Sequence, residues 1–131
     1  MKSTILIVDD DPQVRGVLVR LLSRKERRVL AADDGDQALD IIGREKPLLM
    51  LLDVCMPHMD GLEVLRSALE IQPDLAVVVI SGLADTDKAK RMLDAGAKDY
   101  ITKPIDFEYL ESTVLTQWES PQGAFSWKTR S

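Results

Sequence analysis

The chain has 131 residues, of which 45% are hydrophobic and 30% are charged, a composition typical of one globular domain and too apolar for a disordered chain. Its 22 acidic residues outnumber its 17 basic residues and give a net charge of −5, which argues against nucleic-acid binding because such a surface needs clustered basic side chains. The longest apolar run, residues 75–80, is far shorter than the roughly 20 residues of a membrane helix, so we expect a cytoplasmic protein without membrane contact.

The first half of the chain predicts three strands and two helices. A strand over residues 5–8 leads to a helix that begins at Asp11 and Pro12, since aspartate is a good N-cap and proline fits the first helical position. The apolar stripe of this helix contains Val14, Val17, Leu18, Leu21 and Leu22. After a strand over residues 29–32, a second helix is indicated by Ala38, Leu39 and Ile42 and is expected to end at Gly43 and Pro47. A third strand covers residues 48–52.

The second half continues the alternation. A third helix carries Leu62, Leu65 and Leu69 and ends near Pro73, and a strand over residues 76–80 follows. The fourth helix runs from Asp85 through Ala89, Met92 and Leu93 to Gly96, a candidate C′ glycine. After a short strand over residues 100–101, the fifth helix carries Phe107, Leu110, Val114 and Trp118. Residues 119–131, with the aromatic residues Phe125 and Trp127, break the pattern, so we expect one domain over residues 1–118 and a C-terminal tail or linker over 119–131.

Strict alternation of strands and helices predicts an α/β fold with a doubly wound parallel sheet of five strands flanked by five helices. The strands are continuous apolar runs rather than alternating ones, which indicates burial on both faces of the sheet.

Polar residues of a distinctive kind follow four of the predicted strands. Asp9, Asp10 and Asp11 follow the first, Asp53 the third, Ser81 the fourth, and Thr102 and Lys103 the fifth. In a parallel sheet these strand ends gather at one edge, where ligands of this architecture bind. Carboxylates beside a hydroxyl and an ammonium suit a hard cation and an anionic oxygen ligand, and Mg²⁺ fits best.

The single cysteine, Cys55, and the single histidine, His58, exclude several other sites. An intramolecular disulfide and a cysteine-rich metal site are impossible with one cysteine. With one histidine we expect neither a histidine-clustered zinc site nor a Ser-His-Asp triad.

Four segments resemble the receiver domain of bacterial two-component response regulators, the CheY-like family. They are residues 5–12 (ILIVDDDP), 52–61 (LDVCMPHMDG), 80–82 (ISG) and 95–104 (AGAKDYITKP), and the resemblance extends over nearly the whole chain. It implies the flavodoxin-like strand order 2-1-3-4-5.

The resemblance also implies a role for each strand-end residue. Asp53 would be the phosphoacceptor, a carboxylate nucleophile toward phosphohistidine. Asp10 would be the main Mg²⁺ ligand together with Asp53, Asp9 and the backbone carbonyl of Cys55. Lys103 would pair with the phosphoryl oxygens, and the bond before Pro104 would be cis.

Signalling in this family implies a switch and several partners. Ser81 would turn toward the phosphoryl group and Tyr100 would turn inward, altering the face made by the fourth helix, fifth strand and fifth helix. The resemblance implies a sensor histidine kinase or phosphotransfer protein upstream, an effector downstream, and a homodimer promoted by phosphorylation. The resemblance implies that Cys55 and Leu83 stand at positions that tune the access of water to the acyl phosphate, and this apolar pair leads us to expect slow autodephosphorylation. As a signalling switch, the chain is expected to have no other enzymatic activity.

Simpler interpretations stand beside these roles. Asp11 is better explained as a helix cap than as a ligand. For Asp9 the open alternative is a cap or a neighbour of the ligands, and for Tyr100 it is packing at the edge of the sheet. A magnesium-dependent phosphohydrolase with an aspartyl-phosphate intermediate is an alternative, but such enzymes place an aspartate where Cys55 stands. A degenerate receiver that only binds proteins is another, and the complete set of Asp10, Asp53, Ser81 and Lys103 argues against it.

Overall fold

The computed structural model describes residues 3–115, with the exception of residues 25, 58, 83 and 85, and for residues 113–115 it describes the backbone only. His58, Leu83, Asp85, Trp118 and the tail 119–131 therefore lie outside the described part, and the expectations placed on them stay predictions.

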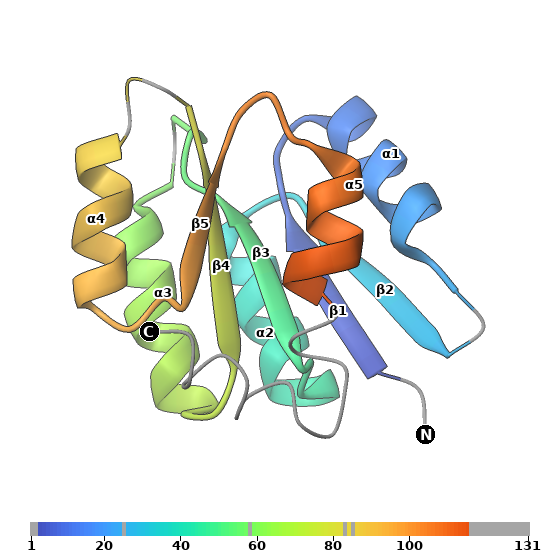
Figure 1. Ribbon diagram of the computed structural model, residues 1–131. Coiled ribbons are helices and arrows are strands. Elements are labelled where there is room, and N and C mark those ends of the chain that lie inside the picture. The colour runs from blue at the N-terminus through green and yellow to red at the C-terminus, as the bar shows by residue number, and fades with distance from the viewer. Residues whose placement is uncertain (1–2, 25, 58, 83, 85, 116–131) are drawn as a thin grey trace.

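The sheet has the predicted architecture. Its five parallel strands are β1 (Ser3–Val8), β2 (Arg27–Ala32), β3 (Leu49–Asp53), β4 (Ala76–Ser81) and β5 (Asp99–Thr102). Their order in space is β2-β1-β3-β4-β5, so the fold class and the implied strand order are both confirmed (Figure 1). β3 and β4 each extend one residue beyond the prediction, which makes Asp53 and Ser81 the last residues of their strands.

The helices are α1 (Pro12–Leu22), α2 (Gly35–Glu45), α3 (Gly61–Ile71), α4 (Thr86–Asp94) and α5 (Phe107–Tyr109), and α5 continues as a π-helical segment, η2 (Leu110–Leu115). The regular fifth helix that the sequence predicts is thus replaced by one α-helical turn and a wider coil. No helix in the described ranges is long and apolar enough to cross a membrane.

Alternate residues of each strand enter different cores, because successive side chains point to opposite faces of a sheet. Leu6, Met50 and Val77 pack with α2, α3 and α4 on one face. On the other face, Ile5 and Leu49 pack with α1 and with Leu110 at the start of η2 (Figure 1). Burial on both sides is the reason for the continuous apolar strands.

Helix ends follow the predicted signals in two cases. Asp11 is the N-cap of α1, and its Oδ1 accepts a hydrogen bond from the Gln13 N–H at 2.9 Å. After α4, Gly96 has a φ of 122°, and the Gly96 N–H and Ala97 N–H donate to the carbonyls of Leu93 and Met92. This is the Schellman arrangement, which requires a left-handed residue at the position of Gly96.

Two expectations are wrong in detail. The exposed Gly43 does not end α2, because intrahelical bonding continues to the Lys46 N–H; Lys46 then adopts a φ of 47°, and the helix stops before Pro47. The apolar stripe of α1 is not buried as one surface: Leu18 and Leu22 are buried, but Val17 is 38% and Leu21 40% exposed. The sheet and Leu110 of η2 cover only Leu18 and Leu22 of this stripe completely.

Candidate functional site

The polar residues that follow the strands meet at the carboxyl edge of the sheet. Asp9 follows β1 directly and Asp53 ends the neighbouring strand β3. One carboxylate oxygen from each of Asp9, Asp10 and Asp53 can be chosen such that all three lie within 4.8 Å of one another. The sheet register therefore brings together three acidic groups from two separate parts of the chain.

Both carboxylate oxygens of Asp53 accept hydrogen bonds. Its side chain is only 2% exposed, and its Oδ1 accepts a hydrogen bond from the Cys55 N–H at 2.7 Å. Its Oδ2 accepts from the Lys103 Nζ at 2.9 Å. The fixed carboxylate thus faces an ammonium group at the edge of the sheet.

Lys103 reaches this position from the connection after β5. Its N–H donates to the Ser81 carbonyl at 2.7 Å, and its peptide bond to Pro104 is cis. Partial burial is the largest influence on its pKa and lowers it, but the hydrogen bond and the charge of Asp53, assisted by Cys55 and Asp9, outweigh that influence and raise the pKa above its ordinary value. Lys103 therefore carries a full positive charge beside Asp53.

Asp9 is the most perturbed carboxylate of the site. It is 1% exposed; its Oδ1 accepts from the Asp11 N–H at 2.9 Å, whereas its Oδ2 is buried and has no hydrogen-bond partner among the described residues. Burial raises its pKa to about 6; the bond from Asp11 opposes the rise, and the nearby charge of Asp53 adds to it. Such a carboxylate oxygen is poorly accommodated without a cation.

The three carboxylates fit a hard divalent cation. Such ions prefer oxygen ligands and are commonly held by one or two carboxylates. Asp10 is half-buried at the margin of the site, and Asp9 offers the buried oxygen for which the described part of the chain supplies no donor. Cys55, whose carbonyl is a further candidate ligand, lies two residues after Asp53 and is half-buried; its Sγ accepts from the Gly82 N–H at 3.2 Å.

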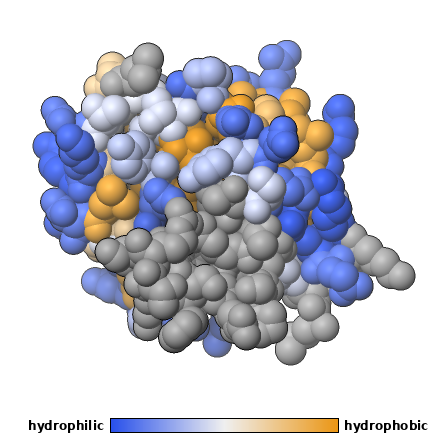
Figure 2. All heavy atoms as spheres, in the orientation of Figure 1, coloured by the Kyte–Doolittle hydropathy of each residue, from blue (hydrophilic) through white to orange (hydrophobic). Residues whose placement is uncertain are grey.

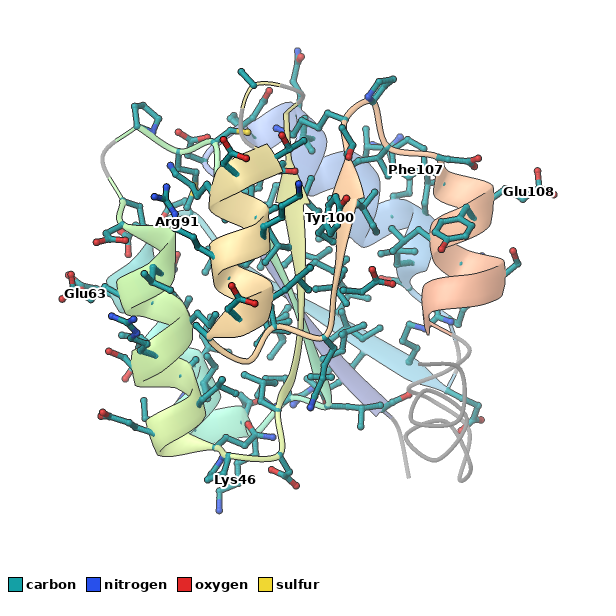
Figure 3. The ribbon with its side chains drawn as sticks, turned by 60° about the vertical axis from the view of Figure 1, so that its left-hand side comes forward. Lys46, Glu63, Arg91, Tyr100, Phe107 and Glu108 are labelled. Carbon is teal, nitrogen blue, oxygen red and sulfur yellow. The ribbon has the colours of Figure 1, made fainter. Side chains whose placement is uncertain are left out.

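Ser81 and Tyr100 lie on the same face of the sheet. Ser81 pairs with Thr102 and Val79 with Tyr100, and Val79 belongs to the core beneath α2, α3 and α4. The Ser81 hydroxyl is fully buried and makes no hydrogen bond within the described part of the chain. Tyr100 is half-buried against the same core and lies between α4 and α5 (Figure 3).

Two contacts at this edge were not anticipated from the sequence. The Arg15 Nη1 on α1 donates to the Asp9 carbonyl at 2.8 Å, and the Lys88 Nζ on α4 lies 3.4 Å from the Val54 carbonyl. Arg15 follows Asp11 by four residues, one helical turn, which is the available signal for its place near the site. Nothing in the sequence around Lys88 indicates its contact.

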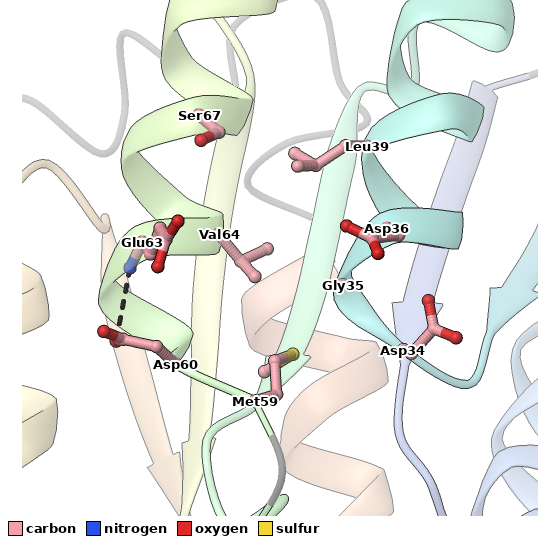
Figure 4. A pocket seen from close by; sticks show the side chains of 9 residues that line it. All are labelled: Asp34, Gly35, Asp36, Leu39, Met59, Asp60, Glu63, Val64 and Ser67. Carbon is pink, nitrogen blue, oxygen red and sulfur yellow. Dashed lines mark hydrogen bonds between the residues drawn. The ribbon is translucent and has the colours of Figure 1, made fainter.

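A separate acidic hollow lies between α2 and α3 (Figure 4). Asp34, Asp36, Asp60 and Glu63 surround an apolar floor that contains Leu39 and Val64. Asp34 and Asp60 are the N-caps of α2 and α3, and their oxygens accept hydrogen bonds from their own helices. These acids serve the helix starts and are not part of the strand-end site.

Known proteins resemble the chain over almost its entire length. A model of the response regulator receiver domain matches residues 5–115. Response regulator MprA from Mycolicibacterium vanbaalenii is 43% identical over 110 residues, which make up 84% of this chain and 48% of that protein. The chain thus spans about half the length of the curated relatives it matches.

Two solved structures illustrate the similarity of the fold. A CheY-like response regulator receiver domain protein from Methanospirillum hungatei superposes with a TM-score of 0.84 at 26% identity and with full coverage of both chains. A response regulator protein from Burkholderia pseudomallei was crystallised with a phosphorylated aspartic acid, a calcium ion and citrate. It superposes with a TM-score of 0.77 at 25% identity, over 99% of this chain and 74% of that one.

Proposed function

Because this chain belongs to the response regulator receiver domain family of two-component signalling, we propose that it is a phosphoacceptor switch in which Asp53 takes up the phosphoryl group. The observation that carries the proposal is the environment of Asp53. A buried carboxylate is oriented by the Cys55 N–H and paired with the Lys103 ammonium beside two further acids. The phosphorylated aspartic acid of the Burkholderia pseudomallei relative supports it.

The transfer itself is a nucleophilic displacement at phosphorus. A carboxylate oxygen of Asp53 forms a new O–P bond while the bond between phosphorus and the donor, the phosphohistidine nitrogen, breaks and its electron pair leaves with the donor. The product is an acyl phosphate on Asp53. No other group of the chain is consumed, so the activity is self-phosphorylation of a switch and not the turnover of a small substrate.

Asp10, Asp53, Asp9 and the Cys55 carbonyl would hold Mg²⁺ at this edge, since oxygen ligands are those it prefers. When bound, the ion would offset the negative charge of the carboxylates and stabilise the phosphoryl oxygens. Asp9 supplies a buried oxygen that no described residue hydrogen-bonds, and the Asp11 N–H keeps that side chain oriented.

Lys103 and Ser81 would bind the phosphoryl group after transfer. Lys103 is already charged and 2.9 Å from Asp53, so it can pair with phosphoryl oxygens without moving far. The buried Ser81 hydroxyl has no hydrogen-bond partner among the described residues, and a phosphoryl oxygen would supply one.

Movement of Ser81 would be transmitted by Tyr100. Tyr100 lies on the same sheet face and is half-buried, so that an inward rotation would change the surface formed by α4, β5 and α5. That surface would then control a downstream effector or favour a homodimer. A sensor histidine kinase or phosphotransfer protein would supply the phosphoryl group, and the expected cytoplasmic location and slow autodephosphorylation belong to the same proposal.

The experiment compares two aspartate-to-asparagine variants of the full chain. With acetyl phosphate and Mg²⁺, intact-protein mass spectrometry is expected to detect one added phosphoryl group on the parent chain and none on Asp53→Asn. Asp60→Asn is the matched control because Asp60 lies on the same connection but caps α3, and it should be phosphorylated as the parent is. Equal phosphorylation of Asp53→Asn and the parent chain would overturn the assignment.

A further inference from the structure

The outer surface of α1 is more apolar than the described fold requires. Val17 and Leu21 are two of the large hydrophobic side chains exposed in the described ranges, and both belong to the α1 stripe that the sequence indicates as core. Val14, one turn before Val17, is half-buried. Val17 and Leu21 are four residues apart on the same helix face, and neighbouring exposed apolar side chains are a surface at which another segment can bind.

This surface forms one wall of a groove. The groove has a volume of about 580 Å³ and lies between α1 and the connection from β5 to α5, where it is lined by Val14, Val17, Gly82, Lys103, Ile105 and Phe107, together with Pro104. Its volume is in the range of pockets that hold ligand-sized apolar groups. Figure 2 shows hydrophobic residues at the surface beside α1 and α5.

A second hollow continues the groove along α1. Leu21, Arg24, Phe107, Glu108 and Glu111 line it, so Phe107 belongs to the walls of both hollows. We call these two hollows, which share Phe107, the trough; its lining residues include Lys103 after β5, Val14, Val17 and Leu21 of α1, and Glu111 in η2.

The chain itself contains a segment of matching chemistry. Trp118, Phe125 and Trp127 are half of its six aromatic residues, although they all lie in its last 14 positions. Trp127 is followed by Lys128 and Arg130. Aromatic side chains bury large areas, and cations beside them would complement the exposed Glu108 at the rim of the trough.

We propose that the C-terminal tail, residues 119–131, binds along α1 of its own molecule, with Phe125 and Trp127 in the groove between α1 and residues 103–107. The described chain reaches Leu115 in η2, which follows α5 directly. The ten residues from Leu115 to Phe125 span at most about 36 Å when fully extended. The 11-residue α1 is only about 16 Å long, so the tail can reach either end of the trough.

The position of the groove places the tail at the edge of the candidate site. Gly82 and Lys103 line the groove, and the same residues contact Cys55 and Asp53. An aromatic side chain bound there would lie next to Lys103, the residue that pairs with Asp53. The docking itself rests on apolar surface, reach and composition, and does not depend on phosphorylation of Asp53.

Tryptophan fluorescence of the full chain tests the docking. In a Trp118→Phe background, Trp127 is the remaining tryptophan, and we expect a blue-shifted emission with several-fold weaker acrylamide quenching than in the urea-unfolded chain. Val17→Asp should restore solvent-like emission and quenching. Ile71→Asp is the matched control, since Ile71 is an exposed apolar residue of α3 and should change neither. Solvent-like emission of the parent, or identical spectra for all three chains, would overturn the proposal.

A second measurement avoids any change in the groove. The substitution Trp127→Ser should shift the backbone amide NMR signals of Val14, Val17 and Phe107 and leave those of α3 unchanged, and these shifts should persist on dilution. Loss of the effect at low concentration would mean that a second copy supplies the tail and would overturn binding within one molecule. Absence of shifts in α1 would exclude the groove as the binding site.

Discussion

The aspartates at the helix starts and those at the strand ends of this molecule differ in burial and in hydrogen bonding. At the helix starts, Asp34 and Asp60 accept hydrogen bonds from the backbone N–H groups of their own helices and remain in contact with solvent. At the strand ends, Asp9 and Asp53 are almost completely buried, and Asp9 keeps an oxygen without a donor among the described residues.

The difference separates structural from functional acids. A capping carboxylate is satisfied by its own helix, so it stabilises the fold and needs no further partner. Two buried carboxylates beside each other cost free energy unless a cation or a proton offsets their charge. In a chain with 22 acidic residues, burial and missing donors identify the site better than the number of acids does.

The largest effect is expected from the cation that faces Asp53. Lys103→Met removes the ammonium 2.9 Å from the Asp53 Oδ2 and should slow phosphorylation by acetyl phosphate by about 100-fold, the usual loss when a charge-stabilising group is removed. Rates are measured by mass spectrometry at fixed Mg²⁺. Lys90→Met, on the exposed side of α4, should react at the parent rate. Equal rates for both variants would remove Lys103 from the site.

The buried carboxylate of Asp9 is expected to destabilise the protein when no metal is bound. In the absence of metal at pH 7.5, Asp9→Asn should raise the free energy of unfolding by about 1 to 3 kcal/mol, because it removes a carboxylate whose pKa burial raises from 3.8 to about 6. The folded parent binds more protons than the unfolded chain between these values. Its stability should therefore fall as the pH rises from about 4 to about 6, and that fall should be absent from the variant.

Urea unfolding followed by circular dichroism, with EDTA present, measures both quantities. Mg²⁺ should stabilise the parent more than Asp9→Asn. A variant that is less stable than the parent under all these conditions would show that the Asp9 charge is already compensated within the fold.

Mg²⁺ binding should depend on pH for the same reason. A proton on Asp9 competes with the cation, so the dissociation constant should rise by roughly tenfold between pH 7 and pH 5, with a midpoint near the Asp9 pKa of about 6. Isothermal titration calorimetry measures this. Affinity that is constant across this pH range would mean that Asp9 does not bind the ion.

The smallest effect is expected at a helix start. Asp60→Ala removes the acceptor of the Leu62 and Glu63 N–H groups and should lower the free energy of unfolding by about 1 kcal/mol, the usual value of an N-cap. Phosphorylation at saturating Mg²⁺ should keep the parent rate. If Asp60→Ala slowed phosphorylation as much as Lys103→Met does, Asp60 would belong to the site as well as to the helix cap.

Particular residues show how far sequence reasoning reaches. Asp11, Pro12 and Gly96 act locally, through a cap, a fixed φ and a left-handed turn, and all three are correctly predicted. Gly43 is not, because a glycine signal cannot tell an exposed helix interior from a helix end; Lys46, a residue without any such signal, takes the left-handed conformation instead.

The difference in burial between the two neighbouring aspartates of the acidic site is also a tertiary matter. The family resemblance implies Asp10 as the main ligand and assigns Asp9 a lesser part, whereas the structure buries Asp9 and leaves Asp10 half-exposed. Neighbouring residues at a strand end point to opposite sides, and which side is covered depends on α1 and β3 and not on the two residues themselves. The contact of Arg15 with the Asp9 carbonyl depends on the same packing.

By itself, the sequence determined the α/β class, the parallel sheet and the edge at which the polar residues gather. These features follow from the spacing of apolar residues and from helix caps, which involve residues close together in the chain. Only the tertiary structure decided that the Asp53 oxygens are shared between Cys55 and Lys103. It also decided that the Ser81 hydroxyl is buried without a hydrogen-bond partner among the described residues, and that Val14 and Val17 of the α1 stripe line a groove. Each of these contacts depends on which segments, far apart in the sequence, pack together, and local sequence patterns do not indicate this packing.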